Sequence, residues 1–429
     1  MNIIPFPDRA EWPALLARPV QSTQQIEATV APILEQVRSG GDAALIVLAQ
    51  KFDKVDLSEG GLEVATSEID AAEDQLSDEL KSAIRQAYQN IRLFHERQTQ
   101  PVEKIETMPG VTCWRKSVGI EKVGLYIPGG TAPLFSTVLM LGIPAQLAGC
   151  REIVLCTPSN NPAIYFAAKL VGVTKVFRIG GAQAIAAMAY GTESVPQVYK
   201  IFGPGNQYVT SAKMLVAKEG MAIDMPAGPS EVAVYADDSA IPAFVAADLL
   251  SQAEHGADSQ VLLVSTSKKL ITSVNLTLTT QLGKLSRQTL AAKALENSKM
   301  ILVESQADAI DLLNAYAAEH LILSVENAET VAEQIINAGS IFLGNYTPES
   351  VGDYASGTNH TLPTNGFARA YSGVSLDSFV KKITIQHITP EGLQNVGPVV
   401  EAMAEAESLD AHKRAVSLRL ASLAEANPV

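Results

Sequence analysis

Two short runs of this sequence contain the residue types that metal binding and proton transfer require. They are Ser251-Gln252-Ala253-Glu254-His255-Gly256 and Ala318-Glu319-His320-Leu321. Gln252 and His255 are three residues apart at the end of an apolar, helix-periodic stretch, so both are predicted to leave one helix face, with the spacing of a metal half-site. Glu319 and His320 are adjacent, so on a helix they would diverge by about 100°. This favours two proton-transfer groups over two ligands of one metal.

The elements that must position these runs alternate between strands and helices. The predicted strands are Val123–Ile127, Glu152–Cys156, Lys175–Ile179, Val198–Phe202, Glu231–Ala236, Gln260–Ser265 and Met300–Glu304. Predicted helices lie between them, including Ile241–Ala253 and Ala307–Glu319. Apolar strands in strict alternation with helices predict parallel sheets covered on both faces. The fold class is therefore α/β, with two Rossmann-like parallel β/α domains, one inserted in the other.

The predicted domain boundaries follow changes in pattern along the 429 residues, a length that exceeds one ordinary core. Residues 1–20 carry four prolines and are predicted to be an N-terminal arm. Residues 21–121 and 231–376 form the first Rossmann-like domain, with the helices of residues 23–97 packed on its sheet. Residues 122–230 form the inserted second domain, and residues 377–429 form a small C-terminal helical tail domain.

Glycine-rich turns follow several strands of the inserted domain. They are Pro128-Gly129-Gly130, Gly180-Gly181-Ala182 and Gly203-Pro204-Gly205-Asn206. Ligands of parallel sheets bind at the carboxyl ends of the strands, where helix N-termini offer free N–H groups to phosphates. No G-x-G-x-x-G follows a strand, so the usual dinucleotide fingerprint is absent. For any one of these glycines, turn formation is the better interpretation.

Composition excludes several classes of partner. The formal charge of −14 argues against nucleic acid, because no basic stripe is present to neutralise phosphates. The longest apolar stretch, Phe135 to Gly149, is interrupted by polar residues and predicts no membrane span, and the N-terminus has no signal-peptide pattern. The three cysteines, Cys113, Cys150 and Cys156, lack metal spacing and are predicted to be reduced thiols of a cytoplasmic protein.

A long patterned segment resembles the signature of histidinol dehydrogenases. It runs from Ile223-Asp224-Met225-Pro226-Ala227-Gly228-Pro229-Ser230-Glu231 through Ala247-Asp248-Leu249-Leu250-Ser251-Gln252-Ala253-Glu254-His255-Gly256. Four further blocks match the family in its order: Gly124-Leu125-Tyr126-Ile127-Pro128-Gly129-Gly130, Phe202-Gly203-Pro204-Gly205-Asn206, Ala318-Glu319-His320-Leu321 and Tyr354-Ala355-Ser356-Gly357-Thr358-Asn359-His360. The resemblance covers nearly the whole chain.

The resemblance implies a role for each matching position. Zinc ligands are Gln252, His255, Asp353 and His412, with one Zn²⁺ per subunit. The acid/base pair is Glu319 and His320. Substrate contacts are Ser230, Gln252, His255, His320, Asp353, Glu407, His412 and, close to the site, His360. NAD is held by Tyr126, Gln183 and Asn206. The family also implies a homodimer with shared active sites, in which the C-terminal tail packs on the partner.

The implied reaction is the NAD-linked, four-electron oxidation of L-histidinol to L-histidine through L-histidinaldehyde, at the end of histidine biosynthesis. Histidinol has two nitrogens that could fill the open positions of a catalytic zinc site. His320 suits removal of the alcohol proton as hydride leaves, and Glu319 suits activation of the water that hydrates the aldehyde.

Three other hypotheses remain open from the residues. A zinc hydrolase would use Glu319 to activate a metal-bound water and would leave the glycine-rich turns unused. A non-catalytic binding module could be built on the same two sheets. A related dehydrogenase could oxidise another small alcohol, such as a sulfonated diol, although the carboxylate of Glu407 suits the imidazole of histidinol.

Overall fold

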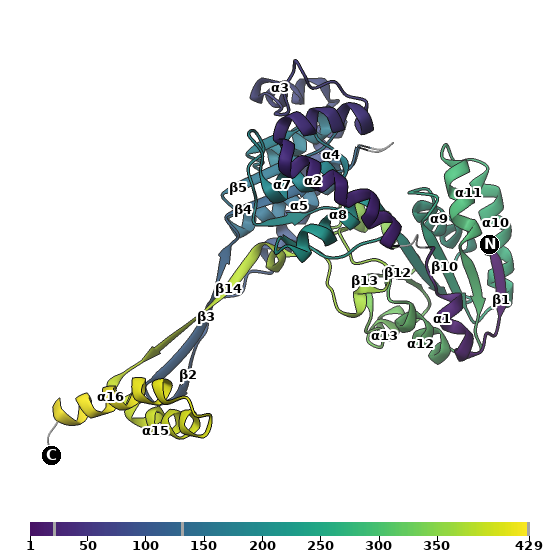
Figure 1. Cartoon of the computed structure of the whole chain (residues 1–429). Coiled ribbons are helices and arrows are strands. Elements are labelled where there is room, and N and C mark those ends of the chain that lie inside the picture. Colours follow the sequence, from purple (N-terminus) through teal and green to yellow (C-terminus); the bar gives the residue numbers. More distant parts are fainter. Residues whose placement is uncertain (20–22, 130–132, 427–429) are drawn as a thin grey trace. The chain divides into compact units, whose positions relative to one another are not determined.

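The computed structural model describes residues 1–19, 23–129 and 133–426, shown in Figure 1. The ends of the predicted arm and of the tail domain, and Gly130 of the first glycine-rich turn, lie outside these residues. The chain divides into two compact units. Unit 1 comprises Met1–Gln98 and Ile120–Phe379, and unit 2 comprises Thr99–Gly119 and Val380–Val429.

Unit 1 contains a five-stranded parallel sheet in the order β6-β5-β4-β7-β8. Its strands are β4 (Lys122–Tyr126), β5 (Glu152–Cys156), β6 (Lys175–Phe177), β7 (Lys200–Phe202) and β8 (Ala222–Ile223). The strand order reverses between β4 and β7, which is the place where ligands of such sheets bind.

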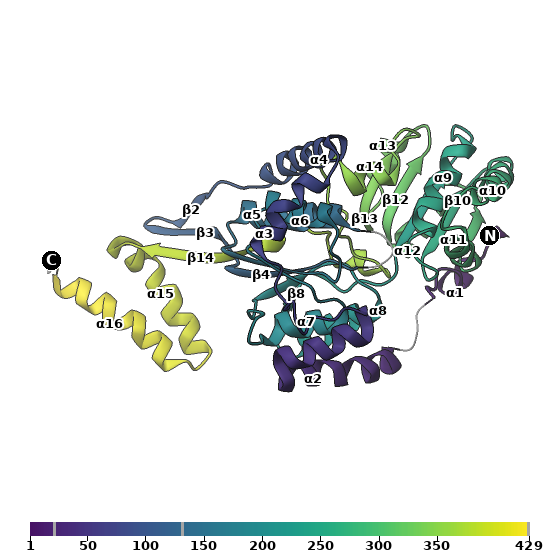
Figure 2. The same ribbon diagram turned by 90° about the horizontal axis from the view of Figure 1, so that it is seen from above.

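Helices cover both faces of this sheet, because alternate strand residues point to opposite sides. Figure 2 shows α4, α5 and α6 on one side and α2, α7 and α8 on the other. Their bounds are α2 (Thr23–Leu48), α4 (Asp78–Glu96), α5 (Phe135–Ala148), α6 (Pro162–Leu170), α7 (Gly181–Tyr190) and α8 (Gln207–Lys218). Short helical segments join α2 to α4: η2 (Ala49–Asp53), α3 (Thr66–Ala71) and η3 (Glu73–Gln75).

A six-stranded parallel sheet forms the rest of the core of unit 1, in the order β1-β11-β10-β9-β12-β13. Its strands are β1 (Asn2–Pro5), β9 (Glu231–Ala236), β10 (Gln260–Ser265), β11 (Lys299–Leu302), β12 (Ala318–Ser324) and β13 (Ala338–Leu343). One face packs on α9 (Pro242–Ala253), α10 (Lys268–Leu282) and α11 (Gln288–Glu296). The other packs on α1 (Trp12–Leu15), α12 (Gln306–Tyr316) and α13 (Ala328–Ala332). The two predicted parallel β/α sheets are thus confirmed.

The predicted N-terminal arm is wrong as a description of residues 1–19. Asn2–Pro5 form β1, the edge strand beside β11, and Trp12 and Leu16 are buried against the sheet. Prolines disfavour a helix, but Pro5 ends an edge strand, where a missing N–H can be tolerated. A short 3₁₀ turn, η1 (Arg9–Glu11), leads into α1.

The helices of residues 23–97 pack on a different sheet from the one predicted. α2 lies against α7 and α8, and α4 lies against α5, so both cover the five-stranded sheet. An amphipathic pattern shows which helix face is buried, but it does not identify the surface that buries it.

Unit 2 is a three-stranded antiparallel sheet with two helices. β2 (Lys104–Met108), β3 (Val111–Gly119) and β14 (Val380–Ile388) pair in the order β14-β3-β2. α15 (Pro390–Ala406) and α16 (Asp410–Ala426) pack on each other. The predicted tail domain therefore omitted a second segment, residues 99–119, which the sequence analysis had assigned to the first domain. Strand pairing between segments this far apart leaves no local signal.

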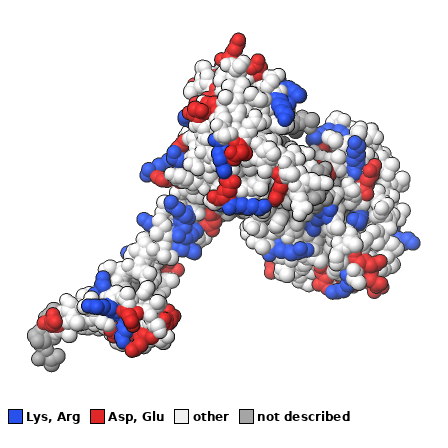
Figure 3. All heavy atoms as spheres, in the orientation of Figure 1, with Lys and Arg blue, Asp and Glu red and all other residues white. Residues whose placement is uncertain are grey.

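Charged residues of both signs are interspersed on the face seen in Figure 3. Among the described residues, no helix has the length and apolarity needed to cross a membrane. The three cysteines are free thiols. The remaining short helices are α14 (Glu349–Tyr354), η4 (Phe367–Arg369) and η5 (Leu376–Phe379).

Candidate active site

Gln252 and His255 lie at the carboxyl end of α9. The helix ends at Ala253, and His255 occupies the turn that follows it. The prediction that both residues lie on one helix face is therefore wrong for His255. Its backbone N–H donates to the Gln252 carbonyl over 3.2 Å. Gln252 is only 1% exposed, and its Oε1 is buried without a hydrogen-bond partner among the described residues. A buried amide oxygen in this state is available to a ligand.

Glu319 and His320 are the second and third residues of strand β12, not the end of a helix. The helix predicted over Ala307–Glu319 stops at Tyr316, because Ala317 adopts a left-handed conformation (φ 54°). The residues after it pair with β9 and β13 on either side. Tertiary strand pairing thus overrides the local helical pattern.

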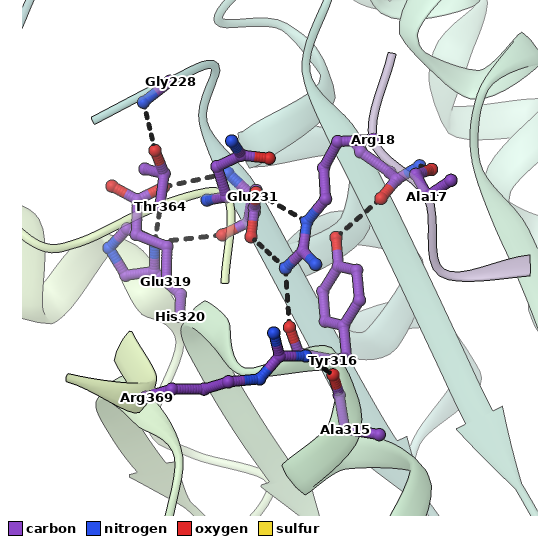
Figure 4. Close-up of polar contacts among 12 residues, drawn as sticks. Ala17, Arg18, Gly228, Glu231, Ala315, Tyr316, Glu319, His320, Thr364 and Arg369 are labelled. Carbon is purple, nitrogen blue, oxygen red and sulfur yellow. Dashed lines mark hydrogen bonds and ion pairs between the residues drawn. The ribbon is translucent and has the colours of Figure 1, made fainter. Parts of the chain in front are cut away.

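The backbone of Glu231 contacts both members of this adjacent pair, as the close-up in Figure 4 shows. The backbone N–H of Glu231 donates to Glu319 Oε2 over 2.8 Å. The Glu231 carbonyl oxygen lies 3.2 Å from His320 Nδ1 and accepts from Gln252 Nε2, also over 3.2 Å. Glu319 Oε2 and His320 Nδ1 are 3.6 Å apart. The candidate acid/base pair and the metal-ligand candidate Gln252 therefore meet at the first residue of β9.

The geometry of parallel β/α units explains this meeting. A helix that follows a strand runs back along the sheet, so its carboxyl end returns to the level of the strands' amino ends. The end of α9 thereby lies beside the starts of β9 and β12. The acid/base site consequently occupies the amino edge of its sheet.

Asp353 and Glu349 come from α14, which packs on α9. Asp353 Oδ1 lies 3.4 Å from His320 Nε2. One donor atom from each of His320, Glu349 and Asp353 lies within 4.8 Å of the others, close enough for a shared cation. Glu349 is 1% exposed, and neither of its oxygens has a hydrogen-bond partner among the described residues. Glu349 is not among the residues that the sequence predicts for the site, although it stands one helical turn before Asp353.

The carboxylates and histidines shift one another's protonation. Burial by itself would lower the pKa of His320, but the charges of Glu349 and Glu319 and the nearby carboxylate of Asp353 raise that pKa well above its usual value. Desolvation lowers the pKa of His255. His255 is thereby held in its neutral form, which is the form that binds metals. The two histidines are suited to different tasks.

Asp248 is a further buried acid on α9, one turn before Gln252. Burial raises its pKa from 3.8 to about 7. The folded protein therefore holds this proton more tightly than the unfolded chain, and stability falls as pH rises from about 4 to about 7, by about 1.4 kcal/mol per unit.

We therefore expect Asp248→Asn to stabilise the metal-free protein at high pH only. Above pH ~7 the free energy of unfolding should exceed that of the wild type by up to about 4 kcal/mol, and near pH ~4 the two should coincide. Thermal melts of both proteins with a chelator, at the two pH values, measure this difference. A stability gain of equal size at both pH values would contradict the raised pKa of Asp248.

His360 contacts the backbone of Asp353. Its Nδ1 lies 2.8 Å from the Asp353 carbonyl oxygen, and its Nε2 lies 2.9 Å from Thr137 Oγ1. Both ring nitrogens thus have protein partners. Ser230 precedes β9, and its carbonyl accepts from the Gln260 N–H.

Glu407 and His412 belong to unit 2. Glu407 directly follows α15, and His412 lies in the first turn of α16. Both side chains are exposed. Unit 1 by itself therefore brings together Gln252, His255, Asp353, Glu319 and His320, but not these two.

The residues predicted to hold NAD lie around the reversal point of the five-stranded sheet. The Tyr126 hydroxyl, at the end of β4, accepts from the Gly181 N–H over 3.1 Å. Gln183 Nε2 donates to Asp53 Oδ2, and Asn206 caps α8 by accepting from the N–H groups of Tyr208 and Val209. Asp53 was not predicted from the sequence.

Gly203 brings the Asn206 turn against Tyr126. A Cβ at this position would lie 2.2 Å from the Tyr126 carbonyl oxygen, and its φ of +136° is a conformation that favours glycine. The turn after β7 can therefore approach the end of β4 only with glycine here. This close approach gathers the three candidate residues at one edge of the sheet.

Known proteins resemble this chain in sequence and in fold. A family model described as histidinol dehydrogenase matches residues 16–420. A histidinol dehydrogenase of Bacteroides thetaiotaomicron is 62% identical over 428 residues, covering 99% of this chain and all of the relative. One from Yersinia pestis is 52% identical over 96% of this chain and 93% of its own length. The crystal structure of histidinol dehydrogenase from Elizabethkingia anophelis superposes with a TM-score of 0.95 at 54% identity, covering 99% of this chain and 98% of that one.

Proposed function

Since this chain belongs to the histidinol dehydrogenase family, we propose that it oxidises L-histidinol to L-histidine through L-histidinaldehyde, with Zn²⁺ in the site and NAD⁺ as hydride acceptor. The observation that carries the proposal is the meeting of Glu319, His320 and Gln252 at the backbone of Glu231. A proton-transfer pair and a metal-ligand candidate thereby share one buried place.

The donor atoms fit a zinc ion. The buried Oε1 of Gln252 lacks a partner among the described residues, Asp353 offers a carboxylate, and the lowered pKa of His255 keeps its imidazole neutral. These three residues, with His412 of the partner subunit, would hold the metal. When bound, zinc offers open positions to the two nitrogens of the substrate and so orients its alcohol carbon.

His320 acts in both oxidations. It accepts the proton of the alcohol while the hydride on the same carbon leaves to NAD⁺, giving the aldehyde, NADH and one proton. The neighbouring charges of Glu349 and Glu319 stabilise the imidazolium that results. In the second oxidation His320 takes a hydroxyl proton of the hydrated aldehyde, and the second hydride reduces a second NAD⁺.

Glu319 acts between the two oxidations. Its Oε2 is held by the Glu231 N–H, and its carboxylate removes a proton from the water that adds to the aldehyde carbon. Tyr126, Gln183 and Asn206 would hold NAD at the reversal point of the five-stranded sheet, which is the expected place for a nucleotide in this architecture.

The direct test supplies histidinol and NAD⁺ and measures histidine and NADH together. We expect two NADH per histidine. NADH formation from a sulfonated diol but not from histidinol would indicate a related dehydrogenase. Metal-dependent hydrolysis without any NADH would indicate a hydrolase, and no turnover of any of these substrates would favour a binding module.

Removing the metal should abolish turnover and spare the fold. Both sheets of unit 1 have extensive apolar cores that need no ion. His255→Asn should have the same effect on turnover. Activity and far-UV circular dichroism, measured before and after chelation and after adding Zn²⁺ back, test this prediction. Full activity of demonstrably metal-free protein would refute the zinc assignment.

A further inference from the structure

A buried ion pair lies directly behind the acid/base residues. Arg18 donates to both oxygens of Glu231, with Nε–Oε1 at 3.0 Å and Nη2–Oε2 at 2.9 Å. The Arg18 side chain is 10% exposed and the Glu231 side chain 1%. This bidentate pair joins the N-terminal segment to the first residue of β9, as Figure 4 shows.

The surrounding contacts fix the pair in one geometry. Arg18 also donates to the Tyr316 carbonyl over 2.7 Å, and its guanidinium lies 3.9 Å from the centre of the Tyr316 ring. The Tyr316 hydroxyl donates to Gln260, whose amide donates to the Ala17 carbonyl next to Arg18. On the other side, the Asn365 N–H donates to Glu231 Oε1 over 2.7 Å.

Glu231 faces two ways. Its side chain binds Arg18, while its backbone N–H contacts Glu319 and its carbonyl oxygen contacts His320 and Gln252. A carbonyl oxygen can only accept, so a hydrogen bond from His320 to it places a hydrogen on Nδ1. Nε2 is then the proton acceptor, and it is the nitrogen beside Asp353.

Stability alone does not explain why such a pair is present. The free-energy cost of removing two charges from water offsets much of their electrostatic attraction. Replacing a buried ion pair with apolar side chains is therefore often neutral or stabilising. Catalytic groups, in contrast, need a fixed orientation, and small displacements cost rate. The pair joins the surrounding network to the residue whose backbone contacts both proton-transfer groups.

We infer that Arg18 and Glu231 are positioning residues, which hold the Glu231 backbone so that His320 and Glu319 keep their working orientation. The inference rests on the proposed function and adds to it a requirement for the N-terminal segment. Neither side chain needs to touch substrate.

The test compares Arg18→Met with Arg9→Met. Arg9 joins the same N-terminal segment to α12 through Asp308 and Asp311, but its ion pairs are exposed. We expect Arg18→Met to lower kcat roughly 10- to 100-fold on both histidinol and histidinaldehyde, as loss of a supporting partner does elsewhere. Both KM values and the zinc content should remain unchanged. Arg18→Lys keeps the positive charge but cannot make the two parallel hydrogen bonds to Glu231, so it should give an intermediate kcat. Arg9→Met should match the wild type.

Stability is separated from positioning by the double variant Arg18→Met/Glu231→Leu, which leaves no unpaired buried charge. It should melt near the wild-type temperature yet retain the low kcat. A wild-type kcat in the folded double variant, or an effect on KM alone, would overturn the inference. Failure of the wild type to form NADH from histidinol would instead overturn the proposed function, so the two failures are distinguishable.

Discussion

Replacing Glu319 with glutamine is expected to slow the oxidation of histidinaldehyde by roughly 10²–10⁴-fold, the usual contribution of a general base, and to slow the oxidation of histidinol to the aldehyde far less. The glutamine oxygen can still accept the Glu231 N–H, so the site should keep its geometry. It cannot remove a proton from water. The step that needs water should therefore lose far more of its rate than the first oxidation, which loses only the effect of the Glu319 charge on the His320 imidazolium.

His320→Asn is the matched comparison, since it removes the adjacent member of the pair. Both oxidations remove a proton from a hydroxyl group, so both rates should fall. Stopped-flow measurement of NADH formation, with each substrate supplied separately, distinguishes the two patterns. Equal losses on both substrates for Glu319→Gln would refute the division of labour.

Mixing two inactive variants is expected to restore activity if the site is shared between subunits. His255→Asn removes a ligand candidate of unit 1, and His412→Asn removes one of unit 2. With shared sites, a heterodimer holds one site with both ligands and one with neither, so about half of normal activity per heterodimer should return. No recovery despite proven subunit exchange would mean that each site is built from one chain.

The surface of unit 2 gives this prediction a physical basis. Large apolar side chains remain exposed on its strands and helices: Val102, Ile105, Ile383, Ile388, Val399, Val400, Met403, Leu409 and Leu418. A unit of this size that leaves so much apolar surface in water is poorly stabilised by its own core. Packing on a second copy would bury that surface. Activity that depends on protein concentration at high dilution would be consistent with this arrangement.

The sequence by itself determined the two parallel sheets. The predicted strands Glu152–Cys156, Glu231–Ala236 and Gln260–Ser265 have the same bounds in the structure. Buried parallel strands must be apolar on both faces, and the helices between them carry their own periodicity, so both signals are local. Residue type and family pattern likewise identified Gln252, His255, Glu319 and His320 as a group.

Only the tertiary structure decided how that group is assembled. It placed Glu319 and His320 on a strand, because pairing with β9 and β13 outweighs the helical pattern that precedes Ala317. It also brought Glu349 and Arg18 to the same place, from segments far apart in the chain. Hydrogen bonds and charge contacts between distant segments leave no periodicity in a sequence, since they depend on which strand ends and helix ends meet in space.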